Sequence, residues 1–239
     1  MTAPAVRQAR FRRPPGATDV ILVRHGESEP AVEGVAFPLV DGHGDPALSP
    51  EGVEQAALVA DRLRHERLDA IYVTSLRRTA QTAAPLVAHL GIEAAVEAEL
   101  REVHLGEWEG GLFRHKTAAA DPIAVRMFTE QRWDVIPGAE PADRFTARVR
   151  GAITRIAAAH PDQRVAVFTH GGVIGEVLAQ ASGARPFAFV GCDNASVSHV
   201  VVGPDRWTVR RVNDTTHLGG GLDRPVDDDA TTGPGGFSA

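Results

Sequence analysis

The chain has 239 residues, of which 43% are hydrophobic and 23% charged, and it is long enough to bury a substantial core. Its formal net charge of −6 argues against general nucleic-acid binding, and no apolar run approaches the length that spans a bilayer, so neither nucleic acid nor a membrane is an expected partner. The single cysteine, Cys192, excludes an intrachain disulfide and fits a reducing compartment, which predicts a cytoplasmic location.

The two ends of the chain differ in composition from the middle. Residues 1–17 contain four arginines and no acidic residue, and they carry Pro-Pro-Gly where a signal peptide needs its apolar segment, which predicts a disordered arm. Residues 219–239 are rich in Gly and Asp and offer too little apolar surface to offset the entropy of ordering, which predicts a disordered tail. One domain is therefore expected over residues 18–218.

The first half of this domain predicts strands alternating with helices. Asp19 to Arg24 is a short apolar run, typical of a parallel strand buried on both faces. Ser49-Pro50 is an N-cap followed by proline at the first helical position. The apolar residues that then repeat at helical spacing are Val53, Ala56, Ala60 and Leu63. A second strand is expected at Ala70 to Val73, and a second helix from Arg78 to Leu90, ended by Gly91.

The second half repeats this pattern. A helix is expected whose buried stripe consists of Phe145, Val149, Ile153 and Ile156. A strand at Val165 to Thr169 and a helix after Gly172 follow. Later runs at Ser196 to Val202 and Trp207 to Val212 predict further strands, with an edge position open to them. The alternation predicts an α/β fold, with a mostly parallel central sheet flanked by helices on both faces.

Chemically active side chains follow three of the predicted strands. Arg24 and His25 end the first strand, Arg77 and Arg78 follow the second, and His170 follows the third. Because ligands bind beyond the carboxyl ends of the strands in open α/β sheets, these side chains should gather at one edge. Arginine matches phosphate oxygens with a planar fork of donors, and a neutral imidazole can attack phosphorus. Together they favour a phosphoryl-group site, although each residue alone is equally compatible with a structural role.

Small residues beside the histidines add to this interpretation. Gly26, Gly171 and Gly172 allow the backbone to approach a ligand, and helices that begin there would direct N–H groups at an anion, with Gly171 as a phosphate-binding candidate. Ser28 has two interpretations of equal weight. Its hydroxyl either donates to the phosphate or caps a helix that follows the first strand.

Four blocks of sequence, in this order, carry a family resemblance: RHGES at Arg24 to Ser28, LRRTAQTA at Leu76 to Ala83, LRE with GEWEG between Leu100 and Gly110, and THGG at Thr169 to Gly172. They resemble the motifs of the histidine phosphatase superfamily, which is also called phosphoglycerate-mutase-like. The resemblance extends from about residue 19 to residue 217, and it implies a phosphoglycerate-mutase-like fold.

The resemblance also implies roles for individual residues. His25 becomes phosphorylated, Arg24, Arg78 and His170 hold the phosphate oxygens, and Glu102 carries the proton. The leaving alkoxide needs a proton and the attacking water later loses one, so a single carboxyl can serve both steps. Glu102 must begin protonated, which requires burial or negative neighbours such as the substrate phosphate.

The family motif selects Arg78 rather than Arg77, which is expected to point to solvent or to an acidic neighbour. The residues close to Glu102 that can wall the substrate pocket are His104, Trp108, Phe113 and His115, with Trp108 expected in core or lid packing. Residues 29–44 are expected to line the entrance. No metal or other cofactor is expected, because arginine supplies the positive charge that a cation would provide.

Several functions compete at this point. Hydrolysis of a small phosphorylated metabolite is favoured over phosphoglycerate-mutase-type transfer, because Glu29-Pro30-Ala31-Val32 follows Ser28 where those mutases have Gln/Leu-Trp-Asn, and because the insertion that resembles their lid is missing. A catalytically inactive phosphate-binding module is the other alternative, which the intact set of site residues opposes. An α/β-hydrolase is excluded, since no Gly-x-Ser-x-Gly is present. The identity of the substrate and the presence of a homodimer stay open.

Overall fold

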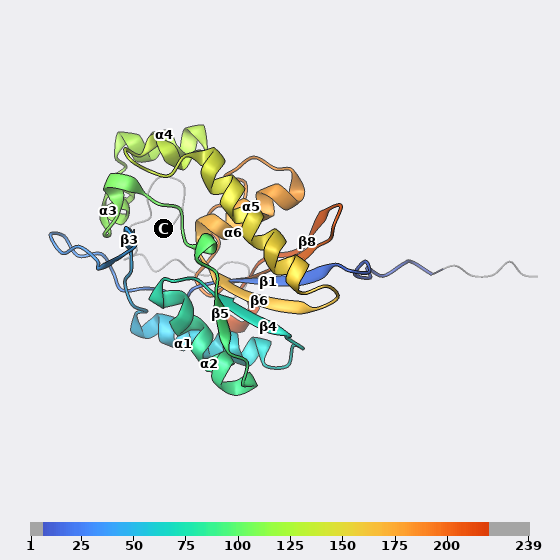
Figure 1. Ribbon diagram of the computed structural model, residues 1–239. Helices are drawn as coiled ribbons and strands as arrows, with labels where there is room; N and C mark the ends of the chain where they lie inside the picture. Colours follow the sequence, from blue (N-terminus) through green and yellow to red (C-terminus); the bar gives the residue numbers. More distant parts are fainter. Residues whose placement is uncertain (1–6, 220–239) are drawn as a thin grey trace, which may run out of the picture.

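The computed structural model describes residues 7–219, and its centre is a six-stranded sheet in the order β5-β4-β6-β1-β7-β8 (Figure 1). The strands are β1 (Thr18–Arg24), β4 (Ala70–Val73), β5 (Ala94–Val96), β6 (Arg164–Thr169), β7 (Val197–Val202) and β8 (Trp207–Asp214). β5, β4, β6 and β1 pair in parallel, whereas β7 and β8 pair antiparallel. The predicted mostly parallel sheet is therefore confirmed, and β8 lies at its edge.

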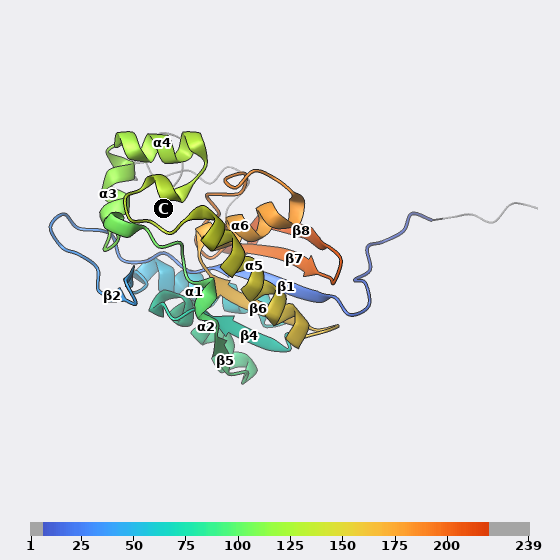
Figure 2. The ribbon, with the colours of Figure 1, turned by 45° about the horizontal axis from the view of Figure 1, so that its top comes forward.

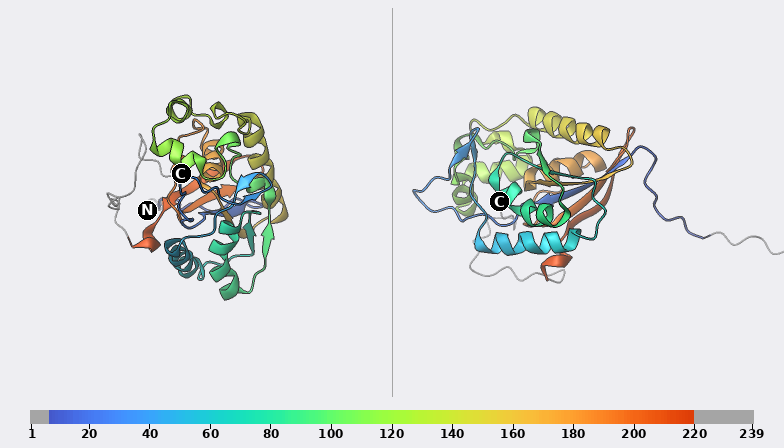
Figure 3. Two further views of the ribbon diagram at one scale, coloured as in Figure 1. Left: turned by 90° about the vertical axis from the view of Figure 1, so that its left-hand side faces the viewer. Right: turned by 60° about the horizontal axis from the view of Figure 1, so that its bottom comes forward.

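Helices cover both faces of the sheet, as predicted. α1 (Pro50–Leu63) and α2 (Arg77–Leu90) pack on one face, and α5 (Ala142–Ala159) and α6 (Gly171–Ser182) pack on the other (Figures 1 and 3). Two shorter helices, α3 (Leu112–Ala118) and α4 (Pro122–Glu130), lie beyond the layers on the side of the carboxyl ends of the parallel strands (Figure 2). These ends are where the predicted site should form.

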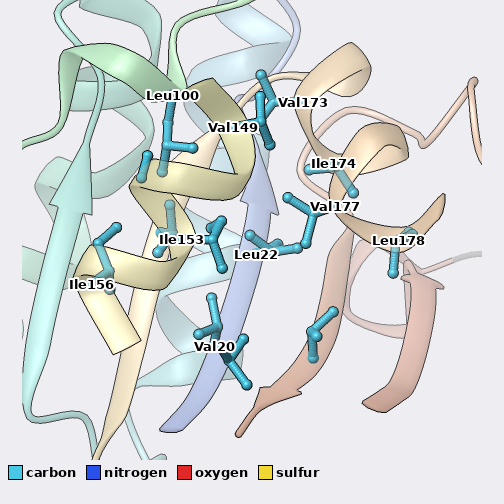
Figure 4. Packing of buried hydrophobic residues seen from close by; sticks show 14 of the residues in the cluster. Val20, Leu22, Leu100, Val149, Ile153, Ile156, Val173, Ile174, Val177 and Leu178 are labelled. Carbon is cyan, nitrogen blue, oxygen red and sulfur yellow. The ribbon is translucent and has the colours of Figure 1, made fainter. Parts of the chain in front are cut away.

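The central strand β1 shows why the sheet needs helices on both sides. All seven of its residues are buried, and alternate side chains point to opposite faces. Val20 and Leu22 pack with α5 and α6 (Figure 4), while Ile21 and Val23 pack with α1 and α2. A continuous apolar sequence is stable here because neither face meets water.

The start of α1 follows the predicted chemistry, but one of its expected core residues does not. The Ser49 side chain accepts a hydrogen bond from the Gly52 N–H, which confirms the N-cap. Val53 was expected in the buried stripe and is instead 58% exposed. The buried face of α1 includes Ala56 and Val59. Val53 is rotated away from this face by about 100°, the angle between successive residues of a helix.

The segment between β5 and α5 folds as a small separate layer that the sequence did not predict. Short elements fill it: η1 (Ala98–Leu100), η2 (Gly106–Trp108), α3, α4 and η3 (Trp133–Val135). Leu100 of η1 packs in the main core, whereas the buried residues from η2 onward form a third hydrophobic cluster, which consists of Trp108, Phe113, Ala124, Met127 and Ile136. Trp108 is thus a packing residue, as expected, and Phe113 packs in the core rather than lining the pocket.

The remaining described elements are a two-stranded ribbon and a final turn. β2 (Leu39–Val40) pairs with β3 (His43–Gly44), and η4 is Thr216–Leu218. In the proposed arm, residues 7–17 form no helix or strand, and Arg13 pairs with Asp19 at 3.0 Å. Apart from residue 219, the predicted tail lies outside the described residues. No described helix has the length and hydropathy needed to cross a bilayer.

Candidate active site

Four predicted site residues meet at the carboxyl edge of the sheet. Arg24 ends β1 and His25 follows it, His170 follows β6, and Arg78 lies in the first turn of α2 after β4. All four side chains are buried. The two imidazole rings lie 5.2 Å apart between centroids and are inclined at 61°. Parallel pairing of β4, β6 and β1 therefore brings together residues that are separated by up to about 145 positions in the chain.

His25 is held in one tautomer. Its Nδ1 lies 2.7 Å from the carbonyl oxygen of Gly26, and a carbonyl can only accept, so Nδ1 carries the proton and Nε2 presents a lone pair. Burial, and then the positive charges of Arg78 and Arg24, lower the pKa of His25 well below its usual value. The ring is consequently neutral at physiological pH and is prepared to act as a nucleophile.

His170 is arranged as a hydrogen-bonding partner. Its Nε2 lies 3.0 Å from the hydroxyl of Thr74, while its Nδ1 is fully buried and has no hydrogen-bond partner in the described part of the chain. Burial, followed by the charge of Arg78, lowers the pKa of His170 well below its usual value as well. When the Thr74 hydroxyl donates to Nε2, the proton resides on Nδ1 and is free for a ligand oxygen.

The two arginines are buried cations held by backbone carbonyls. Arg24 donates from Nη1 to the carbonyl of Cys192, and its buried Nε has no partner among the described residues. Arg78 donates from Nη1 to the carbonyl of Gly44 at 2.9 Å, and burial lowers its pKa to about 10, so it stays charged at neutral pH. Neither guanidinium forms an ion pair within residues 7–219. Because an unpaired buried charge is costly, this arrangement favours binding of an anion.

Glu102 lies beside these residues, in the loop after η1. Its carboxylate accepts from the backbone N–H of Val103 at 2.9 Å and from that of Gly172 at 3.0 Å. Burial lowers the pKa of both Arg24 and Arg78, and the negative charge of Glu102 partly opposes this lowering, which places it within electrostatic reach of the two guanidinium groups. A carboxyl beside a buried phosphate site can donate a proton to a leaving group.

The two remaining predicted residues occupy this pocket differently. Gly171 begins α6 and lies against the guanidinium of Arg24, where an added Cβ would come within 3.4 Å of Nε. Ser28 is buried, but no helix follows β1, so the capping interpretation is wrong; its Oγ instead accepts from Nη2 of Arg114 at 2.7 Å. Its own hydroxyl proton remains free to be donated.

The contacts also show the roles of Gly26 and Arg77. No helix begins at Gly26, whose lack of a side chain serves packing instead, since an added Cβ would lie 2.5 Å from the carbonyl oxygen of Gly52. Arg77 points away from the pocket, and its Nε pairs with Asp45 at 2.7 Å, as expected for an arginine next to an acidic residue.

Arg114 belongs to this site but was not predicted from the sequence. Arg114 extends from α3, donates to Ser28 Oγ and to the carbonyl of Glu29, both at 2.7 Å, and lies over the ring of Phe37 at 5.3 Å. Its charge contributes to the lowered pKa of His25. No motif marked it, because the helix that carries it is short and was not predicted. Within the described residues, no cluster of His, Cys, Asp and Glu suited to a metal ion is present.

Comparison with known proteins agrees with this geometry. Residues 20–215 match the model of the histidine phosphatase superfamily (branch 1). The chain is 33% identical to a metal-independent phosphoserine phosphatase of Arabidopsis thaliana, over 89% of each chain. It is similar to a mycobacterial glucosyl-3-phosphoglycerate phosphatase structure, with a TM-score of 0.69, 26% identity, and coverage of 83% of this chain and all of that one. A phosphoglycerate mutase structure from Bacillus anthracis shares the fold, with a TM-score of 0.71, 21% identity, and coverage of 85% and 96%.

Proposed function

The chain belongs to the histidine phosphatase superfamily, and from this premise we propose that it hydrolyses small phosphate monoesters through a phosphohistidine at His25. The observation that carries the proposal is the state of His25. Its proton is fixed on Nδ1 by the Gly26 carbonyl, which leaves the lone pair on Nε2, and the buried ring is grouped with two guanidinium groups that form no ion pair within residues 7–219.

In the first step, the lone pair of His25 Nε2 attacks phosphorus while the ester P–O bond breaks. The phosphoryl oxygens accept hydrogen bonds from Arg24 Nε and His170 Nδ1, which have no partner among residues 7–219, and from the donors of Arg78 that its contact with Gly44 leaves free. The leaving alkoxide takes its proton from the Glu102 carboxyl.

In the second step, water attacks the phosphorus of the phosphohistidine. The Glu102 carboxylate, held by two backbone N–H groups, takes a proton from the water as the P–N bond breaks. Inorganic phosphate leaves, and His25 returns to its neutral form. Hydrolysis rather than transfer is supported by the relatives named as phosphatases and by the sequence that follows Ser28. We place the reaction in the cytoplasm, in keeping with the single cysteine.

Hydrolysis of p-nitrophenyl phosphate and of an alkyl phosphate tests this proposal. His25→Ala should lower kcat by more than about 1,000-fold on both substrates, because the nucleophile is lost. Glu102→Gln should lower kcat by on the order of 100-fold on the alkyl phosphate and by less on p-nitrophenyl phosphate, whose leaving group scarcely needs a proton. Full activity of a folded His25→Ala variant would refute the proposal.

A further inference from the structure

We propose that Arg114 selects substrates that carry a carboxylate in addition to the scissile phosphate. This inference rests on the proposed function, because it assigns a ligand to the part of the same pocket that the phosphoryl group does not fill. Arg114 would bind the carboxylate through the guanidinium donors that its contacts with Ser28 and Glu29 leave free.

The first argument is the pairing of arginines. Those that are partly shielded from solvent and form an ion pair with a carboxylate are Arg13, Arg62, Arg101, Arg148 and Arg164. Among residues 7–219, the shielded arginines without such a pair are Arg24, Arg78 and Arg114. Two of these line the phosphate pocket, and the third contacts Ser28, which belongs to the same motif as the nucleophile. The unpaired cations are therefore concentrated at a single site.

The second argument is the position of Arg114. Burial, and then the charge of Arg24, lower the pKa of Arg114, and Arg114 in turn contributes to the lowered pKa of Arg78. Arg114 is therefore within electrostatic reach of both Arg24 and Arg78. Arg114 is only half-buried, whereas Arg24 and Arg78 are buried, so Arg114 lies closer to solvent than the other two. The non-reacting part of a substrate would extend in that direction.

The third argument is the count of charges. Arg24 and Arg78 balance a phosphate dianion, and both histidines are neutral because their pKa values are lowered. The charge of Glu27 acts on Arg114 without forming an ion pair with it, and among residues 7–219 no carboxylate is paired with the Arg114 guanidinium. A single additional negative charge balances it, and the planar fork of a guanidinium matches a carboxylate with two parallel hydrogen bonds.

A competing interpretation makes Arg114 a structural link between α3 and the entrance loop. The ring of Phe37 and the Glu29 carbonyl already hold it, and such a link would stabilise the loop without affecting substrate choice. The two interpretations predict different effects of Arg114 on the ratio of activities towards a carboxylated substrate and its uncarboxylated counterpart. Only a carboxylate ligand makes the discrimination between matched substrates depend on Arg114.

Two pairs of substrates that differ at one group provide the test: O-phosphoserine with O-phosphoethanolamine, and 3-phosphoglycerate with glycerol 3-phosphate. The wild type should show a higher kcat/KM for the carboxylated member of each pair. In Arg114→Met this preference should shrink by about 10- to 100-fold, the effect expected for one lost charge-assisted contact. Arg114→Lys should retain part of it, since the charge remains without the planar fork.

Arg126→Met is the matched control, because this arginine lies on α4 with its side chain 59% exposed and paired with Glu130. It should leave all four activities unchanged. If the wild type shows no preference, or if Arg114→Met lowers both members of a pair equally, the inference is wrong. In either case, activity that still depends on His25 would leave the proposed phosphatase function intact, whereas a wild type inactive on every ester would remove both.

Discussion

At the scale of single residues, the site depends on how closely the backbone approaches the Glu102 carboxylate. Gly172 lies in the first turn of α6, and its N–H donates to Glu102 Oε2. An added Cβ at this position would lie 2.5 Å from Oε1, much less than a van der Waals contact. The nearest obstacle is the end of a flexible side chain, so the carboxylate rather than the helix would move.

We therefore expect Gly172→Ala to separate activity from stability. The variant should lower kcat by on the order of 100-fold, because the proton carrier is displaced by an ångström or more. The free energy of unfolding should stay the same or rise by up to about 1 kcal/mol, since alanine is preferred to glycine in a helix. Steady-state kinetics and urea denaturation measure the two effects.

Gly151→Ala is the control for this substitution. Gly151 lies within α5, and an added Cβ there meets only the end of the Arg155 side chain, at 3.4 Å. It should change stability in the same direction and leave kcat unaffected. Undiminished kcat in Gly172→Ala would show that the position of Glu102 does not limit the reaction.

At the scale of elements, α5 holds the loop that carries Glu102. Arg148 on α5 pairs with Glu140 at 2.7 Å, and its guanidinium also donates to the backbone carbonyls of Glu99, Arg101 and Glu102. The side chains of the pair are 13% and 9% exposed. One side chain thus ties the backbone of Glu102, the proposed proton carrier, to the longest helix of the described structure.

Arg148→Met should weaken both the fold and the reaction. The free energy of unfolding should fall by about 3 kcal/mol, because the Glu140 carboxylate is left nearly buried without its partner. kcat should fall as well, since the loop is released. The double variant Arg148→Met/Glu140→Gln should recover part of the stability but not of kcat. Recovery of both in the double variant would mean that the loop does not depend on Arg148.

At the scale of the whole molecule, the histidines link stability to pH. The pKa values of His25, His43, His170 and His217 are all lowered, chiefly by burial. These rings are neutral in the folded protein, whereas the unfolded chain takes up protons as the pH falls through about 6.5. Since the unfolded state then binds more protons, stability is greatest above that pH and falls below it.

We expect the free energy of unfolding to decrease between pH 7.5 and pH 5.5. Each such histidine contributes a slope of up to about 1.4 kcal/mol per pH unit. The variant His25→Asn/His170→Asn removes two of the four groups and should roughly halve the slope. Carboxylates with lowered pKa, such as Asp19, act only at lower pH and do not interfere. Equal slopes in chemical denaturation series of the two proteins would contradict this account.

Much of the fold could be predicted because its central strands are buried on both faces. Continuous apolar runs revealed β1, β4 and β6, and capping residues revealed the start of α1 and the end of α2 at Gly91. β5 was missed, since three residues at a sheet edge carry no such pattern. The layer containing α3 and α4 was also missed. Its elements are short, and they bury side chains against one another rather than against the sheet.

The site residues that follow buried strands could also be predicted, whereas those on other elements could not. The positions of His25, His170, Arg24 and Arg78 follow from strand ends, which the sheet topology brings to one edge. Arg114 could not be predicted, because it reaches the pocket from the layer without a regular pattern. Of the two interpretations of Ser28, the helix cap was wrong for a related reason: residues 25–49 contain no helix that needs a cap.

The central claim is that His25 Nε2 becomes covalently phosphorylated. The most direct test is to stop the reaction rapidly during turnover with a denaturant at neutral or alkaline pH, because acid would hydrolyse a phosphohistidine. Mass spectrometry of the trapped protein should show one added phosphoryl group on the peptide that contains His25, which is lost in acid and retained in base. With p-nitrophenyl phosphate, whose leaving group scarcely needs a proton, the group should accumulate in Glu102→Gln, because attack by water is slowed while the first step is not. Its absence during active turnover in both proteins, or its presence on a different residue, would contradict the account.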